Sequence, residues 1–173
     1  LYLAPKGWFY QNDLAIAKLD QVWIGVVNDE QQTVSPHAAN LARNTVNRAF
    51  RHRGPYNVLT RMLVPQLDGY AERVTFAQNA VNMARTATEL ERFRLAHAEF
   101  PDLLDALTPQ FMQQVPHDII NGQPLHYSRT SDGQFVLYSV GWNEVDDGGR
   151  VVTSKSGTVD RNRGDWVWRY PEK

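Results

Sequence analysis

The chain has 173 residues and a formal net charge of −1 at pH 7, which fits one domain, or one domain with a helical extension. It contains no cysteine, and this excludes disulfides, iron–sulfur clusters, thiol catalysis and cysteine-type zinc sites. The near-zero charge argues against a nucleic-acid-binding protein, because such proteins usually carry a basic patch. No apolar run approaches the roughly 20 residues of a membrane span.

The first element expected is a helix. Residues 1–11 are rich in aromatic side chains and contain proline and glycine, and we expect them to be extended. Asn12 or Asp13 would then cap a helix that runs to about residue 28, because short polar side chains accept hydrogen bonds from the free N–H groups of a first turn.

Two more helices are expected before residue 68. After a linker at residues 28–36, Ser35 would cap a helix that runs to about residue 52, with Pro36 at its first position. Residues 58–67 predict a shorter apolar helix, broken near Pro65.

The longest periodic segment begins at about residue 68. Its apolar side chains recur at helical spacing and predict one amphipathic helix of about 28 residues. The core face would be formed by Phe76, Ala80, Met83, Ala87 and Leu90. Proline residues then delimit a turn and a short helix before residue 116.

Beyond residue 116 the apolar period changes from 3.6 to 2, which predicts strands. Residues 123–130 and 134–141 form a candidate hairpin around an Asp-Gly turn. Residues 149–155 and 165–170 are two further candidate strands. Helices followed by a small antiparallel sheet indicate an α+β fold. We expect residues 1–67 to be a helical extension and residues 68–173 the α+β domain.

An acidic loop at residues 141–149 follows the second hairpin strand. Like charges so close together repel unless something offsets them. Calcium is one candidate, because it takes six to eight oxygen ligands from a flexible loop. An ordinary solvated turn is the other, since Asp-Gly loops are common turns. Asp165 would reach the same place if residues 135–140 and 165–170 are neighbouring strands. The side chains concerned are Asn143, Glu144, Asp146 and Asp147.

The same residues permit an enzymatic alternative. Glu144 with Asp146 or Asp147 would form an acid/base pair of the glycosidase kind, with carboxyl groups about 5–10 Å apart. Such a hydrolase would need a cleft, roofed here by Trp142, Trp166 and Trp168. The five histidines match no common zinc-ligand spacing, so a zinc site is not expected.

From about Thr86 to Gly149 the chain resembles the globular part of the major pseudopilin of type II secretion systems. Three blocks carry the resemblance in the same order: the helix end and following turn at residues 89–107, a Pro- and Gly-containing loop ending in Tyr at 115–127, and a strand with Tyr-Ser-x-Gly and an acidic glycine-rich loop at 135–149. The family would place a pseudopilin-like domain at about residues 70–170.

The resemblance implies one long helix packed on a small antiparallel sheet, preceded here by two or three extra helices. It also implies that Ca²⁺ orders the acidic loop. Asn143 stands where the family usually has Asp, and the basic segment at residues 150–164 is a second departure. Carried over by position, the ligands would be the carbonyl oxygens of Leu137 and Ser139 and the side chains of Asn143, Asp146, Asp147 and Asp165.

A function follows from the resemblance as an expectation. The chain is similar to the C-terminal region of large bacterial envelope proteins that end in a pseudopilin-like domain. It would be a non-enzymatic structural or interaction domain, outside the cytoplasm, with other envelope or pilus-like proteins as partners and no nucleic acid. The chain begins at Leu1 without a signal-peptide pattern, so we expect a piece of a longer protein with a membrane anchor upstream.

Overall fold

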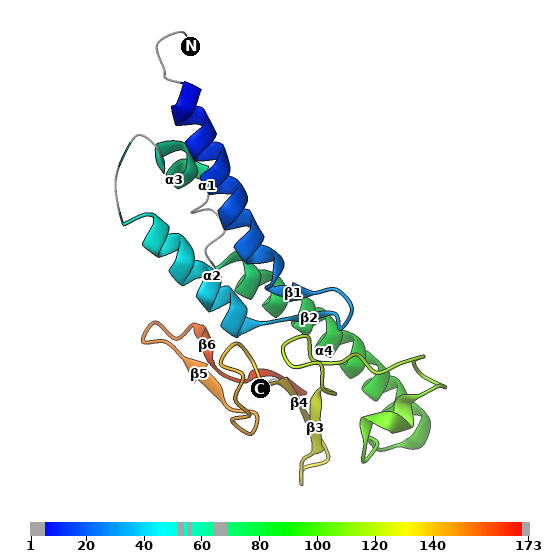
Figure 1. The fold of residues 1–173 in the computed structure, drawn as a ribbon. Helices are drawn as coiled ribbons and strands as arrows, with labels where there is room; N and C mark the ends of the chain where they lie inside the picture. The colour runs from blue at the N-terminus through cyan, green and yellow to red at the C-terminus, as the bar shows by residue number, and fades with distance from the viewer. Residues whose placement is uncertain (1–5, 52–53, 55–56, 64–68, 171–173) are drawn as a thin grey trace.

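The computed structural model of the chain describes residues 6–51, 54, 57–63 and 69–170 (Figure 1). Its helices are α1 (Lys6–Ile24), α2 (Pro36–Ala49), α3 (Val58–Leu63) and α4 (Tyr70–His97), with a short 3₁₀ helix, η3 (Leu104–Leu107). Its strands are β1 (Val27–Asn28), β2 (Thr33–Val34), β3 (His126–Arg129), β4 (Phe135–Ser139), β5 (Val151–Thr153), β6 (Val159–Gly164) and β7 (Trp166–Tyr170).

The architecture is the expected α+β arrangement. A three-stranded antiparallel sheet has the order β3-β4-β7, and α4 packs against β4 and β7. The hairpin predicted around the Asp-Gly turn is confirmed by the pairing of Arg129 with Phe135. The expected neighbourhood of the last strand is confirmed as well, because Ser139 pairs with Trp166. Within the described residues no helix is both long and apolar enough to span a membrane.

The first helix begins earlier than expected. Residues 6–11 belong to α1 instead of forming an extended segment, and residues 1–5 lie outside the described residues. Asn12 is fully buried inside α1, and its Oδ1 accepts hydrogen bonds from the N–H groups of Leu59 and Thr60. Asn12 therefore caps the N-terminus of α3 and not that of its own helix. Because these residues are 47 positions apart, no local sequence pattern predicts the contact.

The expected linker at residues 28–36 is instead mostly a hairpin. β1 pairs with β2, and the N–H of Val34 donates to the carbonyl of Ile119 at 2.7 Å. Ser35 caps α2 as predicted, with its Oγ 3.1 Å from the N–H of Ala38 and Pro36 at the start of the helix. α2 ends at Ala49, about three residues before the predicted end near residue 52. α3 ends at Leu63, and the predicted break near Pro65 lies outside the described residues.

Two further details differ from the sequence expectation. The short helix predicted before residue 116 is the single 3₁₀ turn η3. β6, which was not predicted, pairs with β5 in a separate two-stranded hairpin. β6 has the polar sequence VDRNRG, and this lacks the alternation of apolar and polar side chains by which half-buried strands are recognised.

The N-terminal helices share one core with the α+β part. Met83 and Leu90 of α4 are buried beside Leu137 and Trp166 of the sheet. Val26, Ala39 and Ala42 belong to the same buried cluster. α2 and the end of α1 therefore form an additional layer over this core, as the blue and cyan helices show in Figure 1. The domain boundary near residue 68 stays a prediction.

The buried face of α4 carries a polar stripe. The expected core positions Met83, Ala87 and Leu90 are buried, whereas Phe76 and Ala80 are only half-buried. The remaining buried positions are polar and recur at spacings of four, three and four: Thr75, Asn79, Asn82 and Thr86. The hydroxyl groups of Thr75 and Thr86 donate to the helix carbonyls four residues earlier. The two asparagines are therefore the buried polar side chains that make contacts outside the helix.

Asn79 joins α4 to the rest of the fold. Its Nδ2 donates to Asp118 Oδ1 at 2.9 Å and to Ser139 Oγ at 3.0 Å, and its Oδ1 accepts the N–H of Ile119. The Asp118 carboxylate, with no exposed surface, also accepts the N–H groups of Ile120 and Val140. Because buried charges are costly unless they are hydrogen-bonded, this network fixes residues 117–120 between α4 and β4.

Candidate functional site

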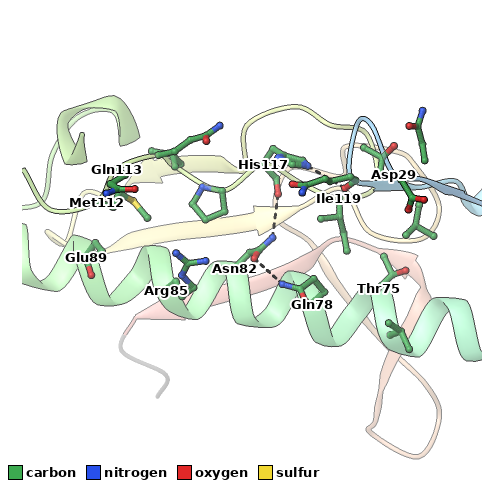
Figure 2. Close-up of a pocket in the computed structure, with 18 of the residues that line it drawn as sticks. Asp29, Thr75, Gln78, Asn82, Arg85, Glu89, Met112, Gln113, His117 and Ile119 are labelled. Atoms are coloured by element: carbon green, nitrogen blue, oxygen red, sulfur yellow. Dashed lines mark hydrogen bonds between the residues drawn. The ribbon is translucent and has the colours of Figure 1, made fainter. Parts of the chain in front are cut away.

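A long groove runs beside α4 (Figure 2). One side is α4 itself, from Val74 to Glu89. The opposite side is formed by residues 111–119 and by the β1–β2 hairpin. Its volume is about 1090 Å³, at the upper limit of the range of about 300–1,000 Å³ that is usual for ligand pockets. The groove is therefore the principal candidate for a binding site.

The floor of the groove is a second row of polar side chains on α4, different from the stripe on its buried face. Its side chains recur at spacings of four, three and four residues, so they lie on one face of the helix. Figure 2 shows them facing the residues of the opposite side. Gln78 Nε2 donates to Asn82 Oδ1 at 3.2 Å, which aligns the two carboxamides. The row consists of Gln78, Asn82, Arg85 and Glu89.

The opposite side is held by hydrogen bonds that span three segments. Asn82 Nδ2 lies 3.5 Å from the carbonyl of His117, a weak contact across the middle of the groove. His117 Nε2 lies 3.2 Å from the carbonyl of Gln32. A carbonyl oxygen only accepts, so Nε2 carries the proton and donates. The hairpin, residues 111–119 and α4 are thus linked near the middle of the groove, at His117.

A small apolar pocket opens from the end of the groove at Val74. Trp23, Val26, Tyr70 and Ala71 line this pocket and not the groove. Its volume is about 220 Å³. Four residues line both the pocket and the groove, which makes the two continuous: Val27, Val34, Val74 and Thr75. The site therefore combines a polar trough with one apolar cavity.

The acidic loop lies on another part of the molecule, against β7. Asp165, which is only 1% exposed, accepts the N–H groups of Asp147, Gly149 and Arg150. The structure thus brings Asp165 to the acidic loop, as the sequence suggested. Desolvation by burial raises the pKa of Asp165 above its usual value, and the three backbone hydrogen bonds oppose that rise.

Asp146 is oriented toward the sheet. Its Oδ1 accepts the Tyr138 hydroxyl at 3.0 Å and the N–H of Gly148 at 2.9 Å. Its Oδ2 lies 3.5 Å from His126 Nδ1. The backbone hydrogen bond from Gly148 is the largest cause that lowers the pKa of Asp146. Burial, together with the contact to Asp146, raises the pKa of Tyr138 to about 12.

The two glycines of the loop turn backbone donors toward the carboxylates. Gly148 and Gly149 have φ angles of +70° and +77°, in the left-handed region that glycine adopts without a steric penalty. In this conformation their N–H groups point at Asp146 and Asp165. The crowding of carboxylates in this loop is therefore offset, at least in part, by backbone N–H groups.

The residues expected to bind calcium are only partly brought together. Leu137 and Ser139 are fully buried in the sheet strand β4. Asn143 Nδ2 donates to Asp147 Oδ2 at 3.0 Å, and its shielded Oδ1 has no hydrogen-bond partner. Among the residues described, no three His, Cys, Asp or Glu side chains gather as a metal-binding group. The Asn143 oxygen fits a hard cation, whereas Asp165 has committed both oxygens to N–H groups.

Of the three tryptophans expected to roof the cleft of the enzymatic alternative, Trp168 is exposed and the other two are buried. Trp142 and Trp166 are 5% and 2% exposed and belong to the core cluster, so they do not overhang a cleft. A general acid needs a raised pKa to hold its proton near neutral pH, and the pKa of Asp146 is lowered. Glu144 is exposed. This geometry offers no support for an acid/base pair.

The sequence alone does not predict the groove. Its side chains lie on α4 and on segments at least 14 residues from the ends of that helix in the sequence. The hairpin that forms part of its edge lies where the sequence predicts a linker. One signal was available, namely the spacing of Gln78, Asn82, Arg85 and Glu89 along the helix. A polar helical stripe most often faces solvent, so the spacing alone does not distinguish a groove from an exposed face.

Comparisons with known protein families, with curated proteins and with solved structures found no match. The function therefore has to be argued from the geometry of the groove and of the acidic loop.

The electrostatics of the acidic loop give a testable pH dependence. Asp165 should titrate above the usual Asp pKa, because desolvation outweighs its hydrogen bonds. Its contribution to stability is then fully present below the unfolded pKa and is lost as the pH rises through the folded pKa. Carbon-13 NMR titration of the side-chain carboxyl groups measures this.

Asp160 is the internal control for that titration. Its hydrogen bond from Arg163 is the largest cause that lowers its pKa, so the two aspartates should shift in opposite directions. A pKa for Asp165 at or below that of an unfolded aspartate would show that the three N–H groups, and not desolvation, dominate its environment.

Proposed function

We propose that this chain is a non-catalytic interaction domain with a pseudopilin-like architecture, and that its partner binds in the groove beside α4. The observation that carries the proposal is the groove itself. It has about 1090 Å³ of space, and its surface is built from carboxamide, hydroxyl, charged and apolar side chains. Sites that bind a partner typically combine apolar surface with a few placed polar groups.

The arrangement of α4 on the β3-β4-β7 sheet supports the pseudopilin-like part of the proposal. One long helix on a small antiparallel sheet is what the resemblance at residues 86–149 implies. The N-terminal layer would be an addition to that unit, and β1–β2 forms part of the groove. Fold alone does not assign a function, so the groove carries the argument about binding.

The proposal places the chain in a bacterial envelope protein, outside the cytoplasm, with an anchor upstream. Its partners would be other envelope or pilus-like proteins. This part rests on the resemblance alone, and a test of groove binding does not depend on it.

Site-directed photo-cross-linking tests the proposal. Because the chain has no cysteine, a single Gln113→Cys variant carries one benzophenone maleimide at an exposed position of the groove. Irradiation in an envelope extract of the source cells should give an adduct, and its partner can be identified by mass spectrometry.

Ser131→Cys is the matched control, because Ser131 is exposed in the β3–β4 turn and does not line the groove. We expect the adduct from Gln113→Cys to be absent from Ser131→Cys. Equal labelling from both positions, or no adduct from either, would reject the groove as a partner-binding surface.

A structural calcium ion in the acidic loop is a second proposal, and Asn143 Oδ1 is the observation that favours it. This oxygen is shielded and lacks a hydrogen-bond partner, while Asp147 lies beside it. A carboxamide oxygen and a carboxylate are ligands that Ca²⁺ accepts. The ion would bind at Asn143 and Asp147 and leave Asp165 with its N–H groups.

Thermal melting in EDTA and in millimolar calcium tests this second proposal, with magnesium as a control. A ligand at a hundredfold excess over its Kd stabilises by about 2.7 kcal/mol, which corresponds to a rise in Tm of about 5–10 °C for a chain of this size. Asp147→Asn should lose the rise and the exposed Glu144→Gln should keep it. An unchanged Tm in the parent protein would contradict calcium binding.

A further inference from the structure

We propose that the occupant of the groove is one extended, uncharged segment of a partner polypeptide, with a single large apolar side chain inserted in the pocket at the end of the groove. This inference rests on the proposed function, since it specifies what the groove binds. Four properties of the site carry it: length, hydrogen-bonding chemistry, the adjoining pocket and charge.

The length of the groove fits a short extended segment. Between Val74 and Glu89 the helix advances by roughly 22 Å, at about 1.5 Å per residue. An extended chain rises by about 3.3 Å per residue, so the groove accommodates about seven residues. Such a segment would lie beside the β1–β2 hairpin at the Val74 end of the groove.

The hydrogen-bonding groups of the groove match a peptide backbone. A carboxamide both donates and accepts, as does each peptide unit of an extended chain. Gln78 is exposed on α4, and Gln113 and Gln114 are exposed on the opposite side. The bound segment would thus meet donors and acceptors on both sides.

Backbone groups on the opposite side are available as well. Residues 112–116 form neither helix nor strand. Within the described part of the chain, the N–H groups of Gln113, Gln114 and Val115 donate to no backbone carbonyl. A segment that lies along them would replace water at these groups, which is how peptide strands are added to free backbone in other recognition modes.

The apolar pocket supplies an anchor. It is lined almost entirely by apolar side chains, among them Trp23, Val26 and Val74. Its volume of about 220 Å³ equals that of roughly seven water molecules, enough for one large aliphatic or aromatic side chain. A few residues usually contribute most of the binding energy, and they are often large side chains buried in such pockets.

The charge of the groove excludes strongly charged partners. Asp29 and Glu89 contribute two negative charges and Arg85 one positive charge, while His117 donates through Nε2 to a carbonyl. These opposite charges leave no dominant sign to attract a polyanion or a basic peptide. Phe111 lines the groove, and its ring packs against that of Phe93, with the ring centroids 5.4 Å apart. Within the groove itself, a sugar ring therefore has little aromatic surface on which to stack.

Panning of a phage-displayed random heptapeptide library on the full chain tests the inference. We expect enriched sequences with few charges and one large apolar residue at a constant position. Fluorescence polarisation then measures the affinity of the enriched peptide for two variants. Val74→Arg should weaken binding at least tenfold, because Val74 lines both the groove and the pocket.

Val81→Arg is the matched control. Val81 lies on the same helix and is 52% exposed, against 48% for Val74, but it lines neither cavity. Its affinity should stay within twofold of the parent protein. Circular dichroism of both variants shows whether α4 remains intact, and Val27→Arg on the hairpin replaces Val74→Arg if that variant does not fold.

The inference is overturned by charge-rich sequences, by no enrichment, by equal effects of the two valine variants, or by binding on a glycan array in place of peptides. Failure here with a groove-specific cross-link from Gln113→Cys means that the partner binds in another form and the proposed function stands. Failure of both experiments rejects the proposed function itself.

Discussion

The Asn79 carboxamide is the contact on which the rest of the structure depends. It bonds at once to Asp118, to Ser139 and to the N–H of Ile119, so one side chain of α4 holds both the sheet and the loop. A buried carboxylate tolerates no loss of partners, because leaving it underbonded costs several kcal/mol. The distance between α4 and residues 117–120 is fixed in this way. Residues 111–119 form the side of the groove opposite α4, so the same network determines where that side lies.

The groove is a consequence of adding the N-terminal layer to the α+β part. Val34 binds to Ile119 through its backbone, and His117 donates to Gln32. These two contacts place the β1–β2 hairpin over the N-terminal half of α4, where the polar groove meets the apolar pocket. On this account the α+β part supplies the scaffold, and the added layer provides the hairpin side of the binding site.

Local chemistry explains which features could be predicted from the sequence. The Ser35-Pro36 start of α2, the 28-residue helix α4 and the hairpin turn at Asp132-Gly133 depend on neighbouring residues. Asn12 and Asn79 depend on partners about 40 to 50 residues away, so no local pattern identifies them. For the acidic loop, the return of Asp165 followed from strand adjacency. The hydrogen bonds from backbone N–H groups to these carboxylates could not be predicted in this way, because the direction of the N–H groups depends on the φ angles of Gly148 and Gly149.

Native-state hydrogen exchange at Ile119, Ile120 and Val140 tests the central role of the Asn79 network most directly. Their N–H groups bind to Asn79 or Asp118. We predict that in the parent protein all three exchange only through global unfolding, with the free energy found by denaturant titration. In Asn79→Ala they should exchange through a local opening, whereas amides of β4 paired with β7 remain protected. Exchange of the three amides at a much lower free energy in the parent protein would contradict the account.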